Sequence, residues 1–174
     1  MWVVKHISFR LSTADIGKAI RELERYRQEI AQKTEMFRKR IADEIAATAS
    51  DGFGASIVND LLDGGSRQAS VEVTTREDGK ITVVMATGKD AVWCEFGAGV
   101  YHNGAVGSSP HPNGEELGMT IGSYGEGRGA RSTWGFYEDD KLKLTHGTPA
   151  TMPMYNAAVD VCSRISEIAR EVFG

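Results

Sequence analysis

A cysteine, a glutamate and a histidine lie within nine positions of each other in the segment AVWCEFGAGVYHNG, residues 91–104. Cys94 as nucleophile, a histidine as base and Glu95 as orienting acid would form the constellation of a cysteine hydrolase. Cys94, however, stands inside an apolar hexapeptide, where the pKa of a thiol rises and its reactivity falls. No local signature of a known cysteine-enzyme family surrounds it. We therefore expect Cys94 to be a core residue, and we keep a small hydrolase as the alternative function.

A metal site is the second chemistry that these residue types suggest. Its ligands would be the histidines at 102, 111 and 146 with Asp139 or Asp140. No two of the histidines have the four-residue spacing of a helical zinc site. His102 and His111 lie in a glycine-rich segment, where we expect solvent-exposed loop histidines. The sequence therefore predicts neither a metal nor a cofactor, and a histidine metal site remains only within the alternative hydrolase hypothesis.

The bulk composition is that of a soluble globular domain. The chain has 174 residues, 41% of them hydrophobic and 25% charged, with a net charge of −4. The first ten residues are too short and polar for a signal peptide, and no apolar run approaches the roughly 20 residues of a membrane helix. We expect synthesis in a cytoplasm, reduced cysteines and no membrane partner. A nucleic-acid-binding accessory protein is a third reading, but the net charge disfavours it, and Arg128 and Arg131 make a weak patch.

The elements that must position these residues begin with a predicted strand over residues 2–11 and a long helix. Apolar residues recur every three, four or seven positions, and no proline or glycine interrupts residues 18–50. This pattern predicts one helix of roughly ten turns, capped near Asp15 and ending at Gly52 or Gly54. A compact domain of this size cannot cover all of that helix, so we expect part of it to pack on a neighbouring subunit, with a simple overhang as the alternative. The residues of the periodic pattern are Ile16, Ile20, Leu23, Ile30, Phe37, Ile41 and Ile45, with Arg27 and Thr34 interrupting it.

Shorter elements follow. A helical turn is expected near residues 55–63, and the alternating run at 69–87 predicts a hairpin with a type I′ turn at Asp78-Gly79. AVWCEF fits a short helix that Asp90 caps and Gly97 stops, with a buried strand as the alternative. Ten glycines lie between Gly97 and Gly129, and residues 98–132 should bury almost nothing and form a flexible insertion. A second hairpin, at 132–147, and a C-terminal helix that begins near Thr151 and Pro153 complete the chain.

These elements indicate one α+β domain over residues 1–174. We expect a small, mainly antiparallel sheet of four to five strands, packed with the long N-terminal helix and the C-terminal helix. The long glycine-rich loop at about 98–132 is an insertion in this domain.

The order of the elements resembles the tail-completion, or head–tail joining, proteins of long-tailed bacteriophages. In that family an aromatic–small–valine–Glu–Phe–Gly–Thr segment follows the hairpin, and Glu95, Phe96 and Gly97 match it, with Ala98 in place of Thr. A proline-containing segment begins the last helix of the family. Met152, Pro153 and the Ala157-Ala158 pair approximate that segment, and Asn156 departs from its second proline.

The resemblance implies a non-enzymatic structural protein in the neck or at the head-proximal end of the tail. Its partners would be further copies of itself in a ring, with six subunits in the virion, and the tail-tube and head-connector proteins. Nucleic acid would only pass through the ring as DNA. The insertion would order against its partner and so control the sequence of assembly. The residues expected at protein interfaces are Glu95, Phe96, Gly97, Tyr101, Tyr124, Arg128, Arg131 and Trp134.

Glu95 is the one charge in the apolar hexapeptide. A charge buried among apolar residues needs a partner. We therefore expect its carboxylate to pair with an arginine or with backbone amides at a junction of the fold or of two subunits.

Overall fold

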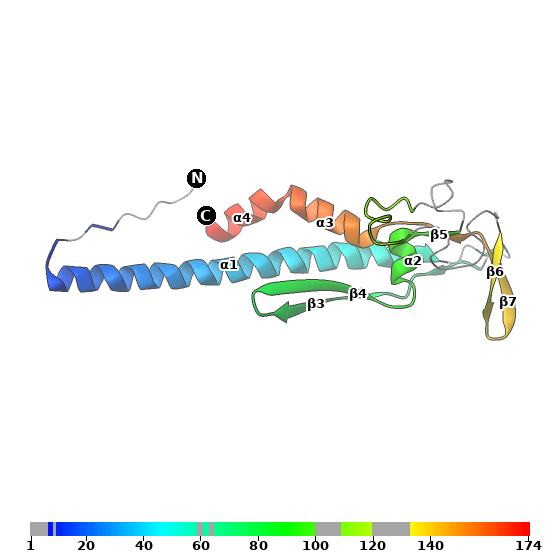
Figure 1. The fold of residues 1–174 in the computed structure, drawn as a ribbon, viewed down its shortest axis with the longest axis horizontal. Helices are drawn as coiled ribbons and strands as arrows, with labels where there is room; N and C mark the ends of the chain where they lie inside the picture. The colour runs from blue at the N-terminus through cyan, green and yellow to red at the C-terminus, as the bar shows by residue number, and fades with distance from the viewer. Residues whose placement is uncertain (1–6, 9, 59–60, 63–64, 100–108, 120–132) are drawn as a thin grey trace.

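The computed structural model describes residues 7–8, 10–58, 61–62, 65–99, 109–119 and 133–174, and the structural statements below refer to these residues. The chain is an α+β structure built along one long helix, α1 (Thr13–Ala55). An antiparallel hairpin over residues 72–87 and a helical C-terminus pack on one half of this helix, and further short antiparallel ladders lie at and beyond its C-terminal end (Figure 1). The α+β class is therefore confirmed.

Helix α1 begins where the sequence predicts and ends slightly later. Ser12 caps it, because its Oγ accepts a hydrogen bond from the amide of Asp15 at 3.1 Å. The predicted stop at Gly52 or Gly54 is wrong, since both glycines lie within the last turns and the chain leaves the helix at Ser56. Gly52 serves packing instead, because a Cβ there would lie 3.0 Å from Cβ of Pro153.

The helical C-terminus consists of two helices, α3 (Pro153–Ser163) and α4 (Ile165–Phe173), which meet at Arg164. They lie along one side of α1, and the hairpin of β3 (Glu72–Asp78) and β4 (Ile81–Thr87) lies along another (Figure 1). The end of α4 reaches Lys33, whose Nζ donates to the carbonyl of Phe173. The hairpin turn reaches Arg38, which donates to Gly79 O and pairs with Glu77 at 2.7 Å.

These contacts divide α1 into two halves. Residues 33–55, the covered half, pack on α3, α4 and the hairpin, and include the buried Ala42, Ala49 and Phe53. Residues 13–32, the bare half, extend beyond them for about 30 Å at 1.5 Å per residue (Figure 1). Ala19 is the one buried residue described in the bare half.

The expected sheet of four to five strands is not formed by the described residues. The strands pair only two by two, because the hairpins attach at separate places along α1 and near its end. Residues 7, 8 and 10 of the strand predicted at 2–11 have no regular structure, and its other residues up to Phe9 lie outside the description. The antiparallel pairs are β1 (Ile57–Val58) with β2 (Arg67–Gln68), β3 with β4, β5 (Ala98–Gly99) with β8 (Gly147–Thr148), and β6 (Trp134–Glu138) with β7 (Lys141–Thr145).

Local predictions around the strands had mixed outcomes. The helical turn expected near residues 55–63 is wrong at its start, where β1 pairs with β2. The first hairpin is confirmed, but its turn lies one residue later, at Gly79-Lys80, and only Gly79 has a positive φ. The turn is thus not type I′, which needs two such residues. The second hairpin is confirmed as β6 and β7, which turn at Asp139-Asp140.

The core lies where the end of α1 meets β1 and α2 (Ala91–Phe96). Phe53, Val58 and Cys94 form its centre, and each is at most 1% exposed. Ala69, Val71, Val73, Ala86 and Met154 pack around it. Among the described helices, none combines the length and apolar character that crossing a bilayer demands.

Candidate functional site

The segment with the most chemistry in the sequence forms α2 and joins three parts of the fold. The predicted short helix is confirmed, and Gly97 ends it with a φ of 77° that favours glycine. Asp90 stands at the N-cap position, but its carboxylate does not cap the helix. It instead accepts two hydrogen bonds from Arg67, at 2.7 and 3.0 Å, and one from the amide of Ser70 at 2.8 Å.

Asp90 is 3% exposed and ties β2 to α2 as a charged group. Burial alone would raise the pKa of its carboxyl, but the hydrogen bonds from Arg67 and the Ser70 amide outweigh burial and hold the pKa below its ordinary value. The carboxylate therefore stays ionised at neutral pH and serves as a fixed acceptor.

Glu95 caps a helix that is distant in the sequence. Its Oε2 accepts from the amide of Met154 and its Oε1 from the amide of Tyr155, both at 2.9 Å. These amides belong to the first turn of α3, whose N-cap residue Met152 makes no side-chain cap and has a left-handed φ of 52°. A carboxylate at this end is also favoured by the helix dipole. The prediction that Glu95 pairs with backbone amides at a junction of the fold is confirmed.

His111 is the third partner of Glu95, and here the sequence expectation of an exposed loop histidine is wrong. His111 is 8% exposed, and its Nε2 lies 3.2 Å from Oε1 of Glu95. Its Nδ1 accepts from the amide of Asn113 at 3.1 Å, so in the neutral ring the proton is on Nε2 and points at Glu95. The rings of Phe96 and Tyr155 contact the imidazole, with centroids 4.6 and 5.2 Å away.

The region around His111 is fastened to α2 by its backbone as well. Ser109 Oγ donates to the carbonyl of Phe96 at 2.6 Å and accepts from the amide of His111. Residues 109–119 form a series of turns in which Gly114 is buried. The expectation that residues 98–132 bury almost nothing is therefore wrong for the middle of the insertion, and residues 98–99 form β5. Residues 100–108 and 120–132 lie outside the description.

Cys94 belongs to the core and also supports the start of α3. Its side chain is fully buried, and burial raises the pKa of the thiol to about 11. Its carbonyl accepts from the amides of Thr151 and Met152 at 2.9 and 3.2 Å. Thr151 Oγ1 in turn lies 2.6 Å from Ser56 Oγ at the end of α1. The position of Cys94 thus suits a packing residue, and a protonated thiol is a poor nucleophile.

The remaining residues expected at interfaces are only partly placed. Phe96 and Gly97 lie beside Glu95 in the junction just described. Trp134 begins β6 in a different part of the molecule. The others, Tyr101, Tyr124, Arg128 and Arg131, lie outside the described residues, so their predicted role in partner binding stays a prediction.

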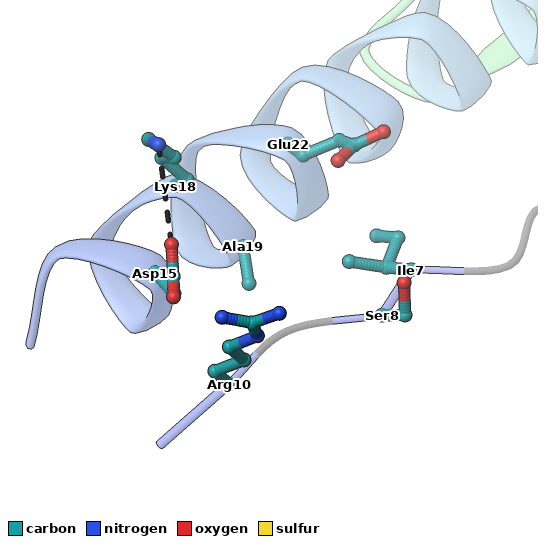
Figure 2. Close-up of a pocket in the computed structure, with 7 residues that line it drawn as sticks. All are labelled: Ile7, Ser8, Arg10, Asp15, Lys18, Ala19 and Glu22. Carbon is teal, nitrogen blue, oxygen red and sulfur yellow. Dashed lines mark ion pairs between the residues drawn. The ribbon is translucent and has the colours of Figure 1, made fainter. Parts of the chain in front are cut away.

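A separate pocket lies between the N-terminal segment and the start of α1. It is lined by Ile7, Ser8 and Arg10 from the segment and by Asp15, Lys18, Ala19 and Glu22 from the helix (Figure 2). Asp15 and Lys18 form an ion pair of 3.9 Å across one helical turn. The lining holds no paired nucleophile and base, and its charged residues are Arg10 of the segment and Asp15, Lys18 and Glu22 along the helix.

The junction at Glu95 therefore acts as a structural joint. Its carboxylate accepts from two amides, lies against one imidazole and is 8% exposed, which suits a group that holds parts of the fold together. Reasoning from the sequence missed His111 and the first turn of α3 as its partners. The SSPHPNG segment did carry a signal, because prolines at 110 and 112 restrict the backbone around His111.

Among the described residues, no three His, Cys, Asp or Glu side chains are grouped so that they could hold a metal ion. No family model matches the chain, and neither a curated protein nor a solved structure shows significant similarity to it.

Proposed function

We propose that the protein is a structural assembly protein of a tailed bacteriophage. It would complete the tail or join it to the head connector, as a ring of copies that receives a neighbouring virion protein. The order of its elements resembles that of the tail-completion family, and this resemblance is the reason for placing the protein in a phage virion. The Glu95-Phe96-Gly97 segment and the start of α3, which carry that resemblance, meet in one joint in this chain.

The observation that carries the proposal is the bare half of α1. Four large apolar residues there have exposed fractions of 39% to 55%: Ile16, Ile20, Leu23 and Ile30. We call these four residues the apolar stripe. A helix that is apolar along one face is stable in water when that face is covered. The described part of the chain leaves the stripe open, which is the expected arrangement in a subunit that is completed by another subunit.

The joint at Glu95 supports the same proposal from the opposite end of the molecule. It fastens residues 109–119, the middle of the long insertion, to α2 and α3. We propose that the insertion contacts the tail-tube or connector protein.

Deletion of the gene in the phage or prophage that carries it tests the proposal. We expect heads and tails that fail to join, or tails of abnormal length, by negative-stain electron microscopy. Supplying the wild-type protein from a plasmid should restore infectious particles, and an antibody against it should label the neck. Normal, infectious virions in the absence of the protein would overturn the virion role.

A further inference from the structure

The apolar stripe follows the repeat of a coiled coil. Ile16, Ile20, Leu23 and Ile30, together with Arg27 and Thr34, are separated by alternating steps of four and three residues. This places 20, 27 and 34 at a positions and 16, 23 and 30 at d positions of a heptad. A second helix with the same 3.5-residue repeat covers such a stripe better than a strand or a loop, because the apolar faces of the two helices stay in contact along their length.

The covered half limits how a second helix can approach. Phe37 continues the stripe, and there it packs edge-to-face on Phe173 at 5.7 Å, next to the hairpin contact of Arg38. A partner helix running parallel to α1 would continue past residue 33 into the face that α4 and the hairpin already occupy. In an antiparallel pair the body of the partner lies beyond the opposite end of the bare half, and only its first helical turn, residues 13–16, reaches positions 34–37 beside Phe173.

Charge complementarity also favours the antiparallel orientation. In a parallel pair Arg27 would face Arg27 of the other copy. In an antiparallel pair centred on residue 25, Arg27 instead lies opposite Leu23 and beside Glu24 of the other copy. Neither Arg27 nor Glu24 forms an ion pair within the described residues, so both are available. The bare half carries four basic and four acidic residues, so two copies do not repel each other.

We propose that two copies of this chain pair through the bare halves of α1 as an antiparallel coiled coil centred on residue 25. Ile20 then packs opposite Ile30 of the other copy, and Ile16 opposite Thr34. A two-fold pair closes on itself and does not extend into a ring. The pair is thus the free form of the protein, and ring formation would require the two copies to separate.

Oligomeric state in solution is the first test. Sedimentation velocity of the full chain should show dimers at about 100 μM and monomers on dilution, because three heptads with polar a residues bind weakly. Leu23→Asp should leave a monomer at every concentration. Met36→Asp is the matched control, since Met36 is 60% exposed on the opposite face of the helix and should leave dimerisation unchanged. Circular dichroism verifies that both variants fold.

The orientation is tested by disulfide trapping in a Cys162→Ser background, with Cys94 buried. A mixture of Ile20→Cys and Ile30→Cys chains should form covalent heterodimers on oxidation. Either variant alone should not, because identical positions lie about 15 Å apart along the antiparallel pair. Cross-linking of either variant alone at the same rate, or a wild-type chain that stays monomeric at about 100 μM, would overturn the proposal. These measurements need only the purified chain, so they stand or fall separately from the virion role.

Discussion

Residues 13–32 and 33–55 belong to one uninterrupted helix with one apolar repeat, yet among the described elements only the second half packs on α3, α4 and the hairpin, while the first half meets residues 7, 8 and 10 of the N-terminal segment around Ala19. In the covered half the repeat meets α3, α4 and the β3–β4 hairpin. In the bare half the same repeat is exposed by up to 55%, at Leu23. Helical periodicity therefore predicts that one face of the helix is covered, but it does not indicate whether the same molecule or another one covers that face. The comparison separates residues that stabilise the monomer from residues that serve assembly.

The largest expected effect is the loss of a core side chain from the covered half. Phe53→Ala should destabilise the monomer by about 3–5 kcal/mol, because it empties the centre of the core. Leu23→Ala in the bare half should change monomer stability by less than about 0.5 kcal/mol. Urea unfolding at low micromolar concentration measures both. Equal losses for the two variants would show that the bare half is covered within the monomer.

Glu95→Gln tests how α3 is held against the covered half. The amide of Gln replaces one acceptor oxygen with a donor, so the Met154 or Tyr155 amide loses its partner. We expect a loss of about 2 kcal/mol and faster hydrogen exchange at the start of α3. Glu116→Gln, an exposed acid in the same insertion, is the control and should change neither quantity. Unchanged exchange in Glu95→Gln would remove Glu95 from its capping role.

Two glycines of the covered half differ in how closely α3 packs on them, so their replacement by alanine should have different effects on stability. Gly54→Ala should stabilise the protein by up to about 1 kcal/mol, because nothing lies within 4 Å of the new Cβ and alanine favours helix. Gly52→Ala should lose that gain, because its Cβ would lie 3.0 Å from Pro153. Thermal unfolding of the two variants should rank Gly54→Ala above Gly52→Ala. The reverse order would mean that α3 moves away from α1 without cost.

The reactivity of the two cysteines distinguishes a buried position from an exposed one, and measuring it requires no substitution. Iodoacetamide at pH 8 should modify Cys162, which is exposed. Cys94 should stay unmodified, because it is fully buried and its thiol has a pKa of about 11. Mass spectrometry of the intact chain should therefore show one added group, rising to two in urea. Rapid modification of Cys94 in the folded protein would revive the cysteine-nucleophile hypothesis.

Local chemistry in the sequence determined most of the elements. The apolar repeat predicted α1, Gly97 predicted the end of α2, and Pro153 predicted the first turn of α3. These features depend on residues a few positions apart, whose propensities act within one element. The end of α1 was predicted too early, because Gly52 and Gly54 are both accommodated within the helix, and Gly52 there lies close to Pro153 of α3.

Only the tertiary structure decided which elements meet. The sequence indicated that Glu95 needed a partner, but the partners are an amide pair 59 and 60 residues away and His111 in the insertion. Likewise, the repeat in α1 was visible from residue 16 to residue 45, but the boundary at residue 33 is set by where α4 ends. Long-range contacts of this kind satisfy polar groups and cover apolar faces collectively, so no single segment encodes them.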